Sequence, residues 1–239
     1  MKTKLNKKLY HQENELPIKI IQFGGGNFMR AFTDYVIDKL NKDANFNAGI
    51  ANIKVTPSGS SFHTFEEQDN LYTLFIRGIK KGELIDENRV ISAIQKSINP
   101  YKEYQDFLKL AKEDQLEFVF SNTTESGIVF DPSEDKLENA PHENFPAKLT
   151  AFLYERYLYF NGDSGKGLTI IPCELIENNA IILKDYILEY AKLWNLENDF
   201  ITWINTSNNF HNTLVDRIVP GFPKDDLESY TNQLNYEDE

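Results

Sequence analysis

Three consecutive glycines, Gly24, Gly25 and Gly26, constrain this chain more than any other feature of its sequence. They follow an apolar stretch, Ile18–Phe23, that has the character of a buried β-strand. Glycine has no Cβ, so consecutive glycines are useful where the backbone turns tightly or where other atoms must come close to it. A second strand is expected at Ile50–Val55, which leaves enough chain between the strands for one β–α–β unit.

Between these two strands the sequence predicts an amphipathic helix. Apolar residues recur at steps of one, three or four, as they do on the buried face of a helix. The residues expected on that face are Ala31, Phe32, Tyr35, Val36 and Leu40. The residues expected to point away from it are Asp34, Asp38 and Lys39.

The order of the remaining elements predicts the fold class. The β-rich stretch 71–94, with a turn at residues 80–82, is expected to leave the main sheet as an antiparallel excursion. An acidic loop is expected at 131–146. Helices are expected at 101–112, 146–160 and 179–194, and buried strands just before 121 and at 167–174. This order predicts an α/β fold with a Rossmann-like, doubly wound, mostly parallel sheet.

Charge and composition exclude several classes of partner. The 239-residue chain has a net charge of −12, which argues against nucleic acid and against an anionic membrane surface. No run approaches the roughly 18 apolar residues of a membrane span, and the N-terminus has no apolar signal segment. The single cysteine, Cys173, excludes an internal disulfide and fits a reducing compartment. We therefore expect a cytoplasmic protein without nucleic-acid or membrane partners.

The glycines resemble part of a dinucleotide-binding motif. Gly24 stands where the turn after the first strand needs a glycine, and Gly26 where the backbone must approach a pyrophosphate. The third glycine of the motif is replaced by Met29, and no acidic residue ends the second strand to hold a ribose 2′-hydroxyl. A bare structural turn and an adenosylmethionine site stay open. The residues alone leave NAD and NADP open as well, because Lys54 could face a 2′-phosphate.

Ordered blocks along nearly the whole chain resemble the long-chain polyol and mannitol dehydrogenase family. They include IIQFGGGNFMRAFTDYVIDKLN, LYTLFIRG, FVFSNTTESGI, FPAKLTAFLYERYLYFNG, IIPCELIENN and NTLVDRIVPGFP. The resemblance implies that residues 1–239 form an NAD-binding Rossmann-like domain, and that a mainly helical, catalytic C-terminal domain completes the enzyme. For the branch matched best it implies NAD-linked interconversion of D-altronate and D-tagaturonate in hexuronate breakdown. A fructuronate or mannitol-type dehydrogenase and a non-catalytic NADH-sensing domain are the alternatives.

The resemblance also implies which residues hold the cofactor. The loop from Gln22 to Arg30 is expected to wrap the pyrophosphate, and the turn after the strand that ends at Ser121 is expected to hold the ribose next to nicotinamide. The expected cofactor-binding residues are Gln22, Phe23, Gly24, Gly25, Gly26, Asn27, Phe28, Arg30, Asn122, Thr123, Thr124 and Glu125. The alternatives to cofactor binding are that Arg30 is a solvated surface charge and that Asn122 and Thr124 only cap the following turn.

The expected substrate residues are Asn179, Asp216 and Arg217, and the expected substrate is a small-molecule sugar acid. Arg217 could pair with a carboxylate in a bidentate manner, although a structural pair with Asp216 is the competing interpretation. The resemblance implies an asparagine that helps polarise the substrate carbonyl at the position of Leu175, and this chain lacks it there.

No catalytic residue and no metal site are expected in this chain. The family's general base is a lysine in a helix of the C-terminal domain, with an asparagine and a histidine that assist it. The spacing of Lys136, Asn139 and His142 does not fit that motif. We therefore expect a fragment that binds the cofactor but does not turn over substrate alone. Its expected partner is the C-terminal domain of the full-length enzyme.

Overall fold

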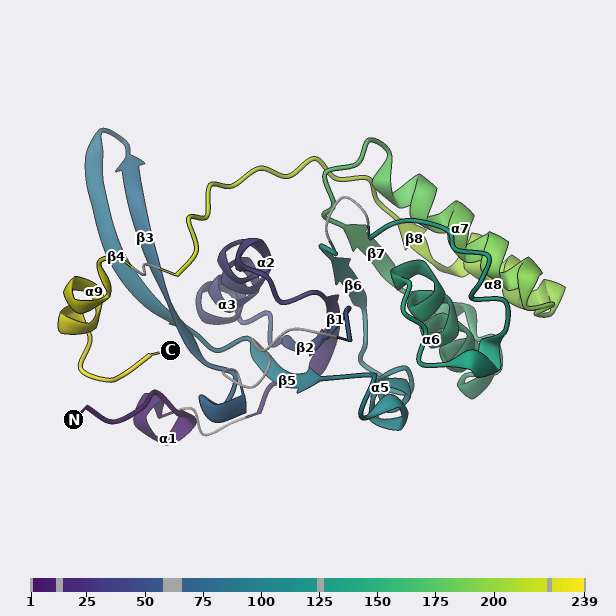
Figure 1. The fold of residues 1–239 in the computed structure, drawn as a ribbon, viewed down its shortest axis with the longest axis horizontal. Helices are drawn as coiled ribbons and strands as arrows, with labels where there is room; N and C mark the ends of the chain where they lie inside the picture. Colours follow the sequence, from purple (N-terminus) through teal and green to yellow (C-terminus); the bar gives the residue numbers. More distant parts are fainter. Residues whose placement is uncertain (1, 12–14, 58–65, 124–126, 223–224, 239) are drawn as a thin grey trace.

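The structure, a computed structural model, describes residues 2–11, 15–57, 66–123, 127–222 and 225–238. Its centre is a six-stranded sheet in the order β5-β2-β1-β6-β7-β8, with every neighbouring pair parallel (Figure 1). The strands are β1 (Ile18–Phe23), β2 (Gly49–Ile53), β5 (Ile94–Ile98), β6 (Phe118–Ser121), β7 (Thr169–Pro172) and β8 (Asn209–Phe210). The strand order reverses between β1 and β6, as it does at the switch point of a doubly wound sheet. The predicted fold class is confirmed.

Each face of the sheet has its own hydrophobic core because successive side chains of a strand point to opposite faces. In β1, Ile20 packs on one face, and Ile21 and Phe23 pack on the other. The first face is covered by α3 (Thr33–Ala44), which follows the short helix α2 (Asn27–Ala31), and by the base of a β-hairpin. The helices on the second face are α5 (Tyr104–Leu110), α6 (Phe145–Tyr159), α7 (Asn179–Leu193) and α8 (Asn198–Ser207).

The expected antiparallel excursion is a hairpin of β3 (Tyr72–Lys80) and β4 (Glu83–Ile91), which extends away from the sheet (Figure 1). Lys81 and Gly82 form its two-residue turn, and both have positive φ, as the tight hairpin turn requires. The excursion ends at Ile91, before the end of the predicted stretch at Ile94, where the next strand begins. That strand, β5, returns to the parallel sheet beside β2.

The buried face predicted for the helix after the glycines is only partly right: Ala31 is buried and Lys39 is exposed, as expected. A break at Phe32 divides the helix into α2 and α3. Val36 and Leu40 are exposed, whereas Asp34 and Asp38 are buried. The hairpin base gives these carboxyl groups their partners, because Tyr72 donates to Asp34, and Ser92 donates to Asp38. Tertiary contacts therefore outweigh the apolar spacing of the helix.

Three elements near the C-terminal end, α8, β8 and α9 (Leu227–Gln233), were not predicted from the sequence. After β8 the residues 211–222 form an extended segment that crosses from the side of α7 to the side of the hairpin (Figure 1). Helix α9 then packs on the hairpin, where Tyr230 contacts Phe75 edge to face. Four shorter elements have little bearing on the site: α1 (Lys7–Tyr10) and the 3-10 helices η1 (Leu137–Asn139) and η2 (Ser164–Lys166), with an isolated bridge from Lys4 to Glu237.

Candidate functional site

Gly24 lies where the carboxyl ends of β1, β2 and β6 meet. Its N–H donates to the Ile53 carbonyl at 3.0 Å, and the Asn122 N–H donates to the Phe23 carbonyl at 3.0 Å. Gly24 has a φ of +103°, and a Cβ on it would stand 2.6 Å from the Asn122 carbonyl oxygen. Two independent features therefore disfavour a side chain at Gly24: the positive φ of its backbone and the close approach of Asn122.

Gly25 and Gly26 differ from each other in what surrounds them. A Cβ on Gly25 would stand 2.4 Å from the side-chain nitrogen of Asn52, which lies under the loop. Gly26 has an extended backbone that any residue can adopt, and no atom lies within 4 Å of the position its Cβ would take. Gly26 is exposed at the start of α2. The fold itself explains the first two glycines and does not explain the third.

The other predicted residues of this loop, which we call the glycine loop (residues 22–30), contribute in different ways. Gln22 is buried, and its amide donates to the Gly24 carbonyl at 3.1 Å. The Phe23 ring lies in the core, so only the backbone of Phe23 faces the loop. Asn27 is exposed beside Gly26. Arg30 Nε donates to the Gly25 carbonyl at 3.0 Å, so Arg30 supports the loop from within the chain. The remaining residue, Phe28, stacks on Phe32.

A second group of polar residues joins the carboxyl ends of β6 and β7. Glu174 accepts hydrogen bonds from the Thr123 N–H and hydroxyl, both at 2.9 Å, and from the Ser121 hydroxyl at 3.0 Å. Burial raises the pKa of Glu174, and these hydrogen bonds oppose that shift. The Asn122 amide donates to the Cys173 carbonyl at 2.7 Å. The two other residues predicted here, Thr124 and Glu125, lie outside the described residues.

Cys173 is unsuited to nucleophilic chemistry. It is buried, and burial raises the pKa of its thiol to about 12. A thiol that stays protonated at neutral pH is a poor nucleophile. In the described ranges, no three His, Cys, Asp or Glu side chains gather where they could hold a metal ion.

Asn179, a predicted substrate residue, is buried and connects three parts of the chain. Its amide nitrogen donates to the Pro172 and Glu174 carbonyls at 3.0 Å each and to the Thr213 hydroxyl at 3.1 Å. Its amide oxygen accepts from the N–H groups of Ala180 and Thr213. These bonds fasten the end of β7 and the start of α7 to the extended segment.

The extended segment brings the remaining predicted residues to the same edge of the sheet. Asp216 is exposed, and the Arg217 guanidinium lies 5.0 Å from the centre of the Tyr35 ring on α3. A Cβ on Gly221 would stand 2.6 Å from the Asn27 side chain, so the segment also passes the glycine loop. The segment therefore runs from the carboxyl end of β7 to the start of α2. It carries Asp216 and Arg217 across the edge where the glycine loop lies.

The sequence interpretation missed polar residues at the end of β2. Lys148 on α6 is buried, and its ammonium group donates to the carbonyls of Val55 at 3.2 Å and Glu143 at 2.7 Å. The Tyr101 hydroxyl donates to the same Val55 carbonyl at 2.8 Å. Burial lowers the pKa of Lys148 to about 8. No residue spacing in the sequence points to this contact, because α6 and β2 are far apart along the chain.

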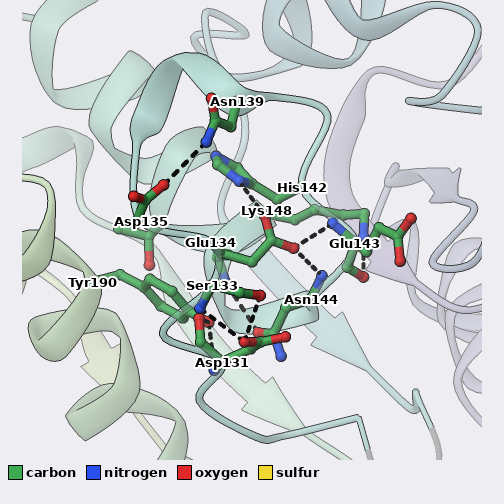
Figure 2. A network of polar contacts seen from close by, with 12 residues as sticks. Asp131, Ser133, Glu134, Asp135, Asn139, His142, Glu143, Asn144, Lys148 and Tyr190 are labelled. Atoms are coloured by element: carbon green, nitrogen blue, oxygen red, sulfur yellow. Dashed lines mark hydrogen bonds and ion pairs between the residues drawn. The ribbon is translucent and has the colours of Figure 1, made fainter.

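The acidic loop beside Lys148 is ordered by Glu134 (Figure 2). Glu134 accepts from His142 Nδ1 at 2.7 Å and from the N–H groups of Glu143 and Asn144 at 2.6 and 2.9 Å. The His142 ring is buried and stacks on Trp194. These contacts give His142 a structural role in holding the loop against α7.

The sheet order and the open glycine at its switch point define a Rossmann-type nucleotide-binding domain. The family model described as "Mannitol dehydrogenase Rossmann domain" matches residues 18–239. The chain therefore belongs to the mannitol dehydrogenase family, which confirms the resemblance found in its sequence.

Curated relatives are similar along nearly the whole chain. "Altronate oxidoreductase" of Bacillus subtilis is 49% identical over 237 residues, which are 99% of this chain and 49% of the relative. "Altronate oxidoreductase" of Halalkalibacterium halodurans is 44% identical over 228 residues, which are 95% of this chain and 44% of the relative. The chain thus spans about half the length of the curated relatives it matches.

Two solved structures share the fold. The Pseudomonas fluorescens mannitol 2-dehydrogenase ternary complex with NAD and D-mannitol has a TM-score of 0.78 at 22% identity, over 96% of this chain and 50% of that chain. D-sorbitol dehydrogenase in substrate-free form has a TM-score of 0.77 at 21% identity, over 99% of this chain and 52% of that chain. Within the described residues, no helix is long and apolar enough to cross a membrane.

Proposed function

We propose that this chain binds NAD against Gly24–Gly26. We further propose that it is the cofactor-binding part of an oxidoreductase that interconverts D-altronate and D-tagaturonate by hydride transfer in hexuronate breakdown. The observation that carries the cofactor site is the empty space over Gly26. The fold does not require a glycine there, and an exposed backbone at the switch point suits the close approach of a pyrophosphate.

Support for the substrate comes from the relatives. Proteins named altronate oxidoreductase are 44–49% identical to this chain over at least 95% of its length. The proposed substrate residues, Asp216 and Arg217, lie on the segment that crosses the same edge of the sheet as the glycine loop. Arg217 suits the carboxylate of a sugar acid, because a guanidinium can hold a carboxylate with two parallel hydrogen bonds. Asn179 would have to give up hydrogen bonds that it makes within the chain in order to bind substrate.

Calorimetric titration with NADH and with NADPH tests the cofactor proposal. We expect NADH to bind the native chain more tightly than NADPH. Gly26→Val should weaken NADH binding by at least about tenfold, because its branched side chain fills the space left for the pyrophosphate. Gly78→Val is the matched control, since Gly78 lies in the exposed part of β3 and also has no atom within 4 Å of its Cβ position. Equal NADH affinity for both variants would contradict a site at Gly26.

Measurement of substrate turnover tests the proposal that the chain is part of an oxidoreductase. Bound NAD would supply the hydride chemistry, and we propose that the proton is transferred by a residue in the part of the relatives that this chain does not match. The chain alone should therefore bind NADH without reducing D-tagaturonate. A version extended by the part of a relative that this chain does not match should reduce it. NADH binding without turnover in the extended version would favour an NADH-sensing role, and adenosylmethionine binding without NADH binding would exclude an oxidoreductase.

A further inference from the structure

A group of buried polar side chains lies directly beneath the glycine loop. Gln22 from β1, Asn52 from β2 and Asp34 from α3 are each 0% exposed. Gln22 and Asn52 are partners in the parallel register of β1 and β2, so their side chains leave the sheet side by side. Tyr72 at the base of the hairpin closes the group, because its hydroxyl contacts Asp34 Oδ2 at 3.1 Å.

The contacts of this group lead to the backbone of the loop. Gln22 donates to the Gly24 carbonyl, and the Asn52 amide lies against Gly25. The one proton of the Tyr72 hydroxyl lies between two acceptors, Asp34 Oδ2 and the Arg30 carbonyl, which is 2.8 Å from the hydroxyl oxygen. Arg30 in turn holds the Gly25 carbonyl. Asp34 is thus connected through Tyr72 and Arg30 to the Gly25 carbonyl, next to the glycine on which a pyrophosphate would rest.

The group is not saturated with hydrogen bonds. Asp34 Oδ1, Gln22 Oε1 and both polar atoms of the Asn52 amide are buried without a partner. An ionised carboxylate with one oxygen unpartnered is costly in such a place, and a bound proton removes that cost. Burial accordingly raises the pKa of Asp34 to about 7, although the hydrogen bond from Tyr72, the nearby Gln22 amide and the charge of Arg30 oppose the shift.

Charged and titratable groups face Asp34 from each element packed around it. Arg30 on α2 favours the ionised carboxylate. The negative charges of Asp34 and of Asp38, which is one turn further along α3, act on Tyr72 of β3. Asp238, from the segment after α9, acts on Arg30. Among the described residues, Arg30 is thus the cation that acts on Asp34, and two further carboxylates, Asp38 and Asp238, lie close to its partners.

We propose that Asp34 is a positioning residue of the glycine loop and takes up one proton from solvent when a dinucleotide binds there. The inference rests on the proposed function. The pyrophosphate brings two negative charges to a loop that Asp34 supports from below. Repulsion between like charges then favours the neutral carboxyl, which keeps its hydrogen bond to Tyr72. Dinucleotide affinity consequently falls as the pH rises through neutrality.

Proton uptake can be measured by calorimetry with NADH at pH 7.5 in two buffers of different ionisation enthalpy. If binding raises the pKa of Asp34 by about one unit, uptake is about half a proton, and affinity is about sevenfold tighter at pH 6.5 than at pH 9. Asp34→Asn should lose both effects. Asp43→Asn, the same change at an exposed position of α3, should keep both. Tyr72→Phe removes a donor to the carboxylate and should move the midpoint of the pH dependence upward.

The outcomes separate this inference from the cofactor proposal. NADH binding without proton uptake, or with uptake that survives in Asp34→Asn, overturns the inference and leaves the cofactor proposal standing. An absence of NADH binding at every pH overturns both. Should Asp34→Asn fail to fold, the Tyr72→Phe midpoint decides, because an unchanged midpoint excludes Asp34 as the proton acceptor.

Discussion

Replacing each of the three glycines by alanine separates what the fold requires from what a ligand requires. The structure predicts three different results for the same one-methyl change. Gly24→Ala should be the most destabilising, because the residue needs a positive φ and its Cβ would meet a backbone oxygen at 2.6 Å. Gly25→Ala should be intermediate, since its Cβ would meet the buried Asn52 amide at 2.4 Å. Gly26→Ala should leave stability unchanged.

The magnitudes follow from these contacts. A side chain at positive φ costs about 1–2 kcal/mol, and overpacking adds about 1–3 kcal/mol. Gly24→Ala should therefore lower the free energy of unfolding by about 2–5 kcal/mol. Gly25→Ala has only the overpacking cost, about 1–3 kcal/mol. Gly26→Ala should stay within about 0.5 kcal/mol, as substitutions at open surface positions do.

Urea unfolding followed by tryptophan fluorescence measures all three free energies. NADH titration of the variants that fold then shows which glycine matters for the ligand. Gly26→Ala should weaken NADH binding although its stability is unchanged. A Gly26→Ala variant that loses as much stability as Gly24→Ala, or that binds NADH as tightly as the native chain, would refute the reasoning.

Two further predictions concern buried polar residues. The pKa of Lys148 is lowered to about 8 in the folded chain from its usual 10.5, so the unfolded chain holds more protons between these values and stability rises with pH. The native chain should gain about 2 kcal/mol between pH 8 and 10 relative to Lys148→Met, measured by urea unfolding, and parallel curves for the two proteins would show that Lys148 does not titrate there. Asn179→Ala should lower stability by about 2–4 kcal/mol, because it leaves the partly buried Thr213 N–H without its partner and removes one donor each from the Pro172 and Glu174 carbonyls. A stability loss below 1 kcal/mol, measured by thermal unfolding, would instead favour a role for Asn179 outside the fold.

Much of the α/β architecture follows from local patterns in the sequence. β1 and the strands beside it are apolar because they are buried on both faces, and the glycines mark the turn that follows β1. The hairpin turn was also predictable, since Lys81 and Gly82 supply the conformations that a two-residue turn needs. Elements with only a weak local sequence pattern were not predicted, and α8 and the two-residue β8 are examples. A two-residue strand has almost no pattern of its own and forms because β7 is already in place beside it.

Some features of the candidate site were likewise predictable from the sequence, and others depend on the tertiary structure. The sequence alone determined that a glycine turn stands between a buried strand and a helix, and it contained one hint that was not used: Gln22 and Asn52 are lone polar residues near the ends of apolar strands. Only the tertiary structure decided which glycine is open and which face of α3 is buried. Asp34 lies inside the protein because Tyr72, 38 positions along the chain, supplies its hydrogen bond. Contacts between residues so far apart in sequence leave no periodic pattern, so their effect appears only when the chain has folded.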